Sequence, residues 1–157
     1  MRDLARRSNG QGFFYYAPMV VPDAATARVL RTQPDIARAI ERYPDLTKAV
    51  VGVGAWQQGL STVVGALTEQ ERRQMYDLGV RSELSGVQID GDGNPVTTSL
   101  TDRLIGIDAR QLHAVPDVIG VAYGTAKVDA VRAGVRGGFI TSLVTHSAMA
   151  SGLLQRA

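Results

Sequence analysis

The sequence contains no cysteine, and this absence excludes several kinds of site at once. Without thiols the chain forms no disulfide bond, no thiolate zinc site and no cysteine nucleophile. It also lacks any apolar run near the ~20 residues that a membrane-spanning helix needs. The basic start MRDLARRSNG is followed by no long apolar stretch, so it does not resemble a signal peptide. We therefore expect a cytoplasmic protein with no membrane partner.

The sequence also lacks an excess of either positive or negative charge. The 17 Lys and Arg residues nearly balance the 15 Asp and Glu residues, for a net charge of +2, and they form no cluster typical of a nucleic-acid-binding surface. Walker A, His-Glu-x-x-His and Gly-x-Ser-x-Gly motifs are all absent. We expect no metal and no cofactor. At 157 residues and 45% hydrophobic, the chain has the composition of one folded domain.

The most informative stretch runs from residue 118 to residue 144. A short apolar strand over 118–122 is followed by Tyr123 and Gly124, by alanines and valines at helical spacing to Arg136, by two glycines, and by an apolar strand over 139–144. This order predicts a βαβ unit with parallel strands.

The rest of the chain predicts further alternation of helices and strands. Strands are expected over 13–16, 46–53, 80–90 and 103–107, and helices over 24–32, 34–43, 68–78, 108–115 and 146–154. Residues 57–66 are expected to form a loop or irregular helix. The pattern predicts an α/β fold with a mainly parallel sheet flanked by helices.

Two glycine-ended strands point to a ligand site. Gly52 and Gly54 end one strand and Gly124 ends another, and open α/β sheets bind ligands at the carboxyl ends of parallel strands. Lys127 adds a positive charge to the helix N-terminus that follows Gly124, so an anionic ligand is expected there. Gln57 stands where a dinucleotide fingerprint requires its third glycine, so we prefer a backbone-lined ligand loop to a nicotinamide site.

Other polar residues give weaker signals. Taken alone, Glu83 is an unremarkable surface acid. His113 is interpreted as a surface or packing residue and Ser147 as a helix cap, and Trp56 is more often a packing residue than the lining of a pocket. The run DGDGNP at 90–95 is similar to a calcium loop but lacks the later bidentate Glu, so we expect a turn.

Three stretches together resemble a known family. They are AVVGVGAW at 49–56, SELSGVQIDGDGNPV at 82–96 and RLIGIDARQLHAVPDVIGVAYGTAKVDAVRAGVRGGFITSLVT at 103–145. In this order and spacing they are similar to the effector-binding, or sugar-binding, domain of SorC/DeoR-type bacterial transcriptional regulators. The resemblance runs from about residue 17 to the C-terminus and corresponds to the C-terminal part of that domain.

The resemblance implies a fold shared with glucosamine-6-phosphate isomerase, ribose-5-phosphate isomerase and CoA transferases. It implies a phosphorylated sugar or related small polyol as effector, with Lys127 on its phosphate or hydroxyls and Glu83, where the family usually has Asp, on its hydroxyls. Gly52, Gly54 and Gly124 would let backbone N–H groups approach the ligand. His146 replaces the aspartate that ends the family's LVTD motif, which leaves the role of that aspartate without a counterpart here.

The resemblance also implies a domain plan and partners. Residues 1–16 are expected to be a loose N-terminal segment or cut edge, and 17–157 a partial effector-binding domain. The helix-turn-helix domain that contacts DNA in the family does not occur in this sequence. We expect a homo-oligomer and a non-enzymatic sensor. A sugar-phosphate isomerase or deaminase with Glu83 as base, and a truncated association module, stay open as alternatives.

Overall fold

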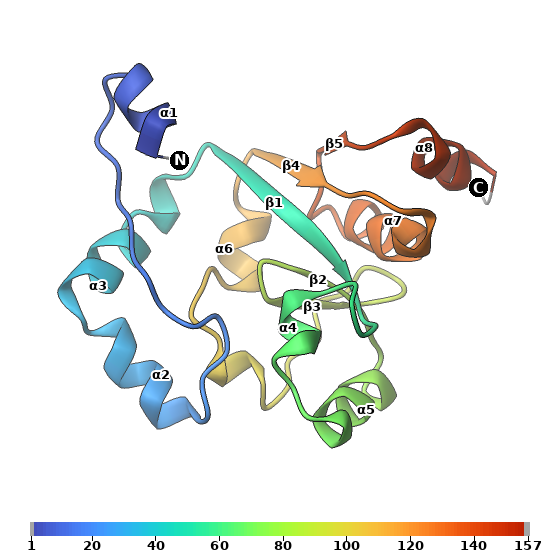
Figure 1. Ribbon diagram of the computed structural model, residues 1–157, viewed down its shortest axis with the longest axis horizontal. Coiled ribbons are helices and arrows are strands. Elements are labelled where there is room, and N and C mark those ends of the chain that lie inside the picture. The colour runs from blue at the N-terminus through green and yellow to red at the C-terminus, as the bar shows by residue number, and fades with distance from the viewer. Residues whose placement is uncertain (1, 156–157) are drawn as a thin grey trace.

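A five-stranded sheet forms the centre of the chain, for which the computed structural model describes residues 2–155 (Figure 1). The strands lie in the order β3-β2-β1-β4-β5. Their bounds are β1 Lys48–Ala55, β2 Val80–Leu84, β3 Val87–Asp90, β4 Asp117–Val121 and β5 Ser142–Val144.

Helices precede, connect and follow these strands. The α-helices are α1 Arg2–Arg7, α2 Ala24–Arg31, α3 Pro34–Ile40, α4 Thr62–Gly65, α5 Glu69–Asp77, α6 Ala109–His113, α7 Val128–Arg136 and α8 Ser147–Leu154. Short 3-10 turns lie at η1 Tyr43–Asp45, η2 Thr101–Arg103 and η3 Thr125–Lys127. None of the helices within 2–155 is both long enough and apolar enough to cross a membrane.

The sheet is mixed, so the prediction of a mainly parallel sheet is wrong. β1 pairs with β4, and β4 with β5, in parallel, whereas β1–β2 and β2–β3 are antiparallel. The antiparallel pair of β2 and β3 arises at Ser85 and Gly86, which both have positive φ angles, of 51° and 93°. Two successive residues of this kind form a tight hairpin turn. The single strand expected over 80–90 is therefore folded into two.

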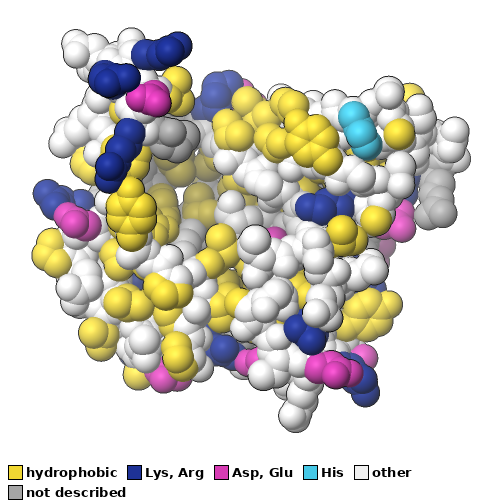
Figure 2. Space-filling model, viewed as in Figure 1, with side chains coloured by type: hydrophobic (Ala, Val, Ile, Leu, Met, Phe, Trp, Pro, Cys, Tyr) yellow, Lys and Arg dark blue, Asp and Glu magenta, His cyan; other side chains and the backbone are white. Residues whose placement is uncertain are grey.

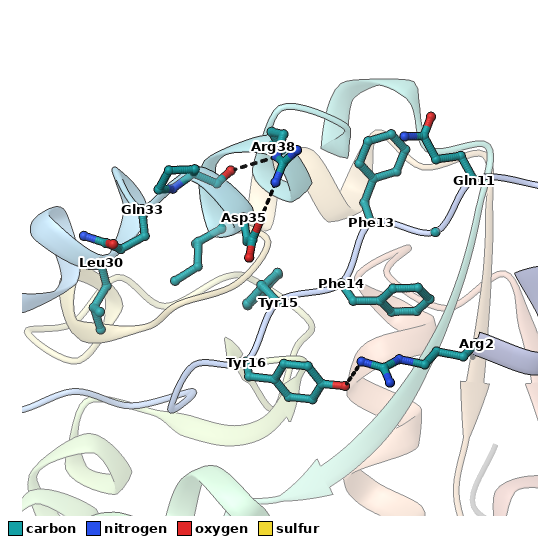
Figure 3. A pocket seen from close by; sticks show the side chains of 13 residues that line it. Arg2, Gln11, Phe13, Phe14, Tyr15, Tyr16, Leu30, Gln33, Asp35 and Arg38 are labelled. Atoms are coloured by element: carbon teal, nitrogen blue, oxygen red, sulfur yellow. Dashed lines mark hydrogen bonds and ion pairs between the residues drawn. The ribbon is translucent and has the colours of Figure 1, made fainter.

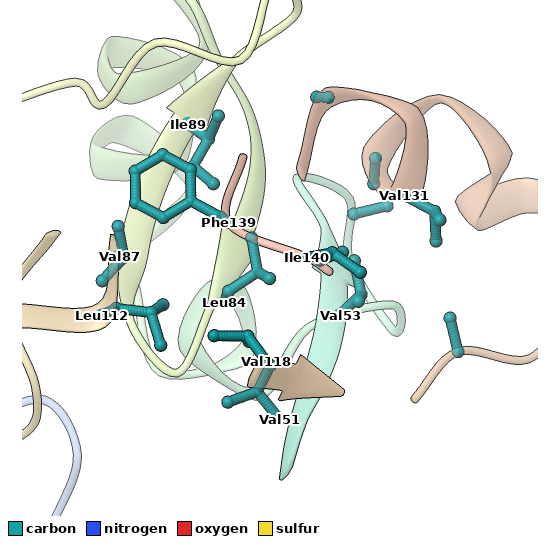
Figure 4. Close-up of a cluster of buried hydrophobic side chains, with 14 of the residues drawn as sticks. Val51, Val53, Leu84, Val87, Ile89, Leu112, Val118, Val131, Phe139 and Ile140 are labelled. Atoms are coloured by element: carbon teal, nitrogen blue, oxygen red, sulfur yellow. The ribbon is translucent and has the colours of Figure 1, made fainter. Parts of the chain in front are cut away.

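The predicted βαβ unit is confirmed in β4, α7 and β5. The buried face of α7 packs on the sheet through Val131, in one cluster with Val53 and Phe139 (Figure 4). Gly134 in α7 allows close packing here, since a Cβ atom at that position would lie 2.7 Å from Cδ1 of Ile140. Leu112 of α6 joins the same cluster, so α6 and α7 cover one face of the sheet.

Side chains cap the N-termini of several helices. The Asp23 carboxylate accepts a hydrogen bond from the Thr26 N–H at 2.7 Å, and capping boxes form at Thr68 and at Asp108, as their patterns predict. At α8 the cap is His146 and not Ser147, because the His146 Nδ1 accepts from the Met149 N–H at 3.2 Å.

Two predicted strands do not form. Residues 13–16 run beside α2 and α3 without strand pairing (Figure 1), and Tyr15 packs there in a cluster with Ile36. Leu104 makes a single bridge with Val20 instead of starting a strand over 103–107. The N-terminal segment expected to be loose contains α1, which has an ion pair between Asp3 and Arg6 but buries none of its side chains.

Candidate functional site

A cavity of about 550 Å³ lies at the carboxyl end of β1, beside α4. Its lining combines charged, hydroxyl and glycine positions: Met19, Gly52, Val53, Gly54, Gly59, Leu60, Ser61, Thr62, Gly65, Glu83, Ser85 and Lys127. Four of the five residues predicted as ligand contacts are thus brought together, and Gly124 is the one left outside the lining.

Glu83 lies within β2 and is only 5% exposed, so its interpretation as a surface acid is wrong. One carboxylate oxygen accepts a hydrogen bond from the Ser61 hydroxyl at 2.9 Å, and the other accepts from the Gly86 N–H at 2.9 Å. The first bond ties Glu83 to the start of α4, which Ser61 caps through the Val64 N–H. The second ties it to the hairpin turn. A buried carboxylate needs such partners, and these two also fix its orientation at the cavity.

Gly54 is opposite Glu83 in the antiparallel pair of β1 and β2. A Cβ atom at Gly54 would lie 2.2 Å from the Glu83 Oε1 and 2.8 Å from the Ser61 Cβ. The Glu83 carboxylate therefore occupies the space that a side chain at position 54 would need, which excludes any residue larger than glycine. Gly52 is different, since a Cβ atom there would meet nothing within 4 Å. Of the two glycines, Gly52 is the one that leaves space open to a ligand.

Lys127 ends the 3-10 turn η3 and stands at the N-cap position of α7. Its side chain is half-buried, and its ammonium group donates a hydrogen bond to the Val53 carbonyl at 2.8 Å. This bond holds the positive charge at the end of β1 and uses one of the three ammonium donors. Gly124 has a φ angle of 86° and precedes η3, so it turns the chain that carries Lys127 into place.

Ser61, Thr62 and Ser85 line the cavity without having been singled out from the sequence. For Ser61 a signal existed, because serine before a short apolar helical run is a typical N-cap. For Ser85 the signal was the Ser-Gly pair at a hairpin turn. Together these residues place an ammonium group, a carboxylate and hydroxyls around one space, which suits a small polyhydroxylated anion.

A second cavity, of about 710 Å³, lies between the N-terminal segment and helices α2 and α3 (Figure 3). Its charged side chains are engaged locally: Arg38 pairs with Asp35, and Arg2 donates to the Tyr16 hydroxyl at 2.9 Å. It is larger, but it lies away from the carboxyl ends of the strands, where α/β sheets bind ligands. We therefore assign the candidate site to the cavity beside β1.

Comparison with known proteins identifies the family. A family model described as "Putative sugar-binding domain" matches residues 1–155. The transcriptional regulator YjhU of Escherichia coli K12 is 30% identical over 152 residues, which is 96% of this chain and 46% of YjhU. The transcriptional regulator LsrR of Klebsiella pneumoniae is 29% identical over 142 residues, 88% of this chain and 44% of LsrR. The chain thus spans about half the length of the curated relatives it matches.

Solved structures show the same fold. The full-length sorbitol operon regulator SorC from Klebsiella pneumoniae matches 96% of this chain and 49% of its own, with a TM-score of 0.86 at 19% identity. A domain of a possible sugar-binding transcriptional regulator from Arthrobacter aurescens matches 98% of this chain and 60% of its own, with a TM-score of 0.84 at 22% identity. With the match of the family model along almost the whole sequence, these findings establish that the chain belongs to the sugar-binding domain family of SorC/DeoR-type transcriptional regulators.

Proposed function

We propose that this chain is the effector-sensing part of a transcriptional regulator and binds a phosphorylated sugar or related small polyol. The observation that carries the proposal is that the Lys127 ammonium and the Glu83 carboxylate line the same cavity at the carboxyl end of β1. Family membership supports a sugar as the ligand, and the positive charge of Lys127 supports a phosphate group on that sugar.

The two charged groups divide the recognition between them. The Lys127 ammonium donates to phosphate or hydroxyl oxygens, and such charge-assisted hydrogen bonds are about twice as strong as neutral ones. The Glu83 carboxylate accepts from sugar hydroxyls on the lone pairs that Ser61 and Gly86 leave free. Backbone at Gly52 gives the ligand room to approach.

The signal reaches DNA through parts of the regulator outside residues 1–157. A separate helix-turn-helix domain contacts the operator in the cytoplasm, and a homo-oligomer transmits the change. The effector biases DNA affinity only by the difference between its affinities for the two arrangements of the regulator.

The test is calorimetric titration of the chain with a panel of hexose and pentose phosphates and their unphosphorylated counterparts. Lys127→Ala should weaken binding of the phosphorylated ligand by about 1.5–3 kcal/mol, the contribution of a hydrogen bond to a charged group. Lys48→Ala is the matched control, because Lys48 begins β1, at the end remote from the cavity, and pairs with Asp117. Equal affinity in Lys127→Ala and the parent would remove Lys127 from the site.

The alternative of a sugar-phosphate isomerase or deaminase gains less support. Acid/base catalysis needs groups poised together at one substrate carbon, and the described lining of the cavity offers Glu83 and Lys127 but no second carboxylate and no histidine. The matched curated relatives are named transcriptional regulators. Turnover of any sugar phosphate in the panel would favour the enzyme over the sensor.

A further inference from the structure

The two faces of β1, β4 and β5 are in different environments. Val51 and Val118 point to the face that α6 and α7 cover, and both are buried. The alternate residues point to the other face, where Val50 is 68% exposed and Val144 is 50% exposed. The described residues leave this second face open to solvent.

The exposed Val50 and Val144 form one apolar surface with the half-buried Ile119 and Val121. The strand register pairs Val50 with Ile119, and Val121 with Val144. Tyr123, 62% exposed, follows directly after β4. We call Val50, Ile119, Val121, Tyr123 and Val144 the open sheet face. Figure 2 shows hydrophobic side chains gathered over β4 and β5 on this side of the molecule.

The borders of the open sheet face are polar at one end and lead into the cavity at the other. Lys48 and Asp117 pair across β1 and β4 and form an ion pair at the amino-terminal end. At the carboxyl end Gly52, two residues after Val50, lies on the same face and also lines the candidate site. An apolar centre with a polar rim is typical of an interface.

Parallel strands in α/β proteins are almost always covered by helices on both faces, and a contiguous exposed apolar patch marks a contact surface. The length of related chains indicates which part of the polypeptide covers this face. A solved domain with the same fold extends well beyond the matched region, since this chain matches 60% of it, and YjhU extends further.

We propose that an amphipathic helix from the regulator polypeptide outside residues 1–157 docks on the open sheet face. Its apolar side packs on Val50, Ile119, Val121 and Val144. Because Gly52 belongs to both surfaces, the same helix forms a wall of the effector cavity. The proposal rests on the exposure of the face and on chain length, so it stands or fails independently of the identity of the effector.

The absence of cysteine makes a direct test available. Single thiols are introduced as Val50→Cys and Val144→Cys on the face and as Val29→Cys on α2, where Val29 is 61% exposed. Reaction rates with a maleimide are measured in the whole regulator polypeptide and in residues 1–157 alone, each checked by circular dichroism. In the whole polypeptide the two face thiols should react at least ~10-fold more slowly than in residues 1–157, while the Val29→Cys thiol reacts equally in both.

Three results would overturn the proposal. The first is equal reactivity of the face thiols in the two proteins. The second is protection in residues 1–157 alone that increases with concentration, with a dimer in light scattering, because a second copy then covers the face. The third is a reading frame that encodes nothing outside residues 1–157.

Discussion

At the scale of single residues, two glycines two positions apart in β1 have different physical reasons to be glycine. Gly54 must admit the Glu83 carboxylate, whereas Gly52 has free space in front of it. Gly54→Ala should therefore displace Glu83 and lower the free energy of unfolding by about 1–3 kcal/mol, the usual cost of overpacking a filled site. Urea unfolding of the two alanine variants measures this difference.

Gly52→Ala is the matched control, and the same pair tests the site. The Gly52→Ala substitution should leave the free energy of unfolding within about 0.5 kcal/mol of the parent, because the added methyl group meets no protein atom within 4 Å. If the cavity holds the effector, that methyl group enters ligand space and weakens binding. Equal loss of stability in the two variants would contradict the different roles assigned to the glycines.

At the scale of elements, an ion pair joins α5 to η2. The Arg103 guanidinium donates to Glu71 at 2.5 Å, and Glu71 also closes the capping box with Thr68. The hydrogen bond from Arg103, with those from Thr68, lowers the pKa of Glu71 to about 2 from 4.5. Because the pKa is depressed in the folded state, its contribution to stability is present above about pH 4.5 and is lost as the pH falls towards 2.

Glu71→Gln should therefore lower the free energy of unfolding at neutral pH and flatten its decline between about pH 4.5 and pH 2. Glu69→Gln is the control in the same turn of α5, because the Glu69 side chain is 78% exposed and pairs across the helix surface with Arg73. Denaturant unfolding across this pH range measures both variants. A slope in Glu71→Gln equal to that of the parent would exclude Glu71 as its source.

At the scale of the whole molecule, we expect the same substitution to change stability by very different amounts on the two faces of the sheet. Val50→Asp should change the free energy of unfolding of residues 1–157 by less than about 1 kcal/mol, the span of strand propensities at exposed positions. Val51→Asp should cost about 3–5 kcal/mol, because it leaves an unpaired charge beneath α6 and α7. Thermal and urea unfolding distinguish the two. A large loss in Val50→Asp would mean that residues 1–157 already cover the open sheet face, by association.

Local signals in the sequence predicted much of the fold, and their failures have a common cause. The caps at Asp23, Thr68 and Asp108 act within four residues, so they are present in the sequence itself. The strand expected over 13–16 does not form, because a strand needs a neighbouring strand with which to form hydrogen bonds. Residues 80–90 failed because the turn at Ser85 and Gly86 reverses an otherwise apolar, alternating run.

The sequence by itself determined the βαβ unit and the helix caps, because each depends on residues close together in the chain, and the family resemblance, which depends on the order of three stretches. Gly52 and Gly54, expected to end their strand, lie inside β1, which continues to Ala55. Only the tertiary structure decided that Glu83 is buried against Gly54 and Ser61, that Lys127 reaches the Val53 carbonyl, and that one face of the sheet is open. These contacts join residues up to 74 positions apart. Their geometry follows from the pairing of β1 with β2 and β4, which no local pattern encodes.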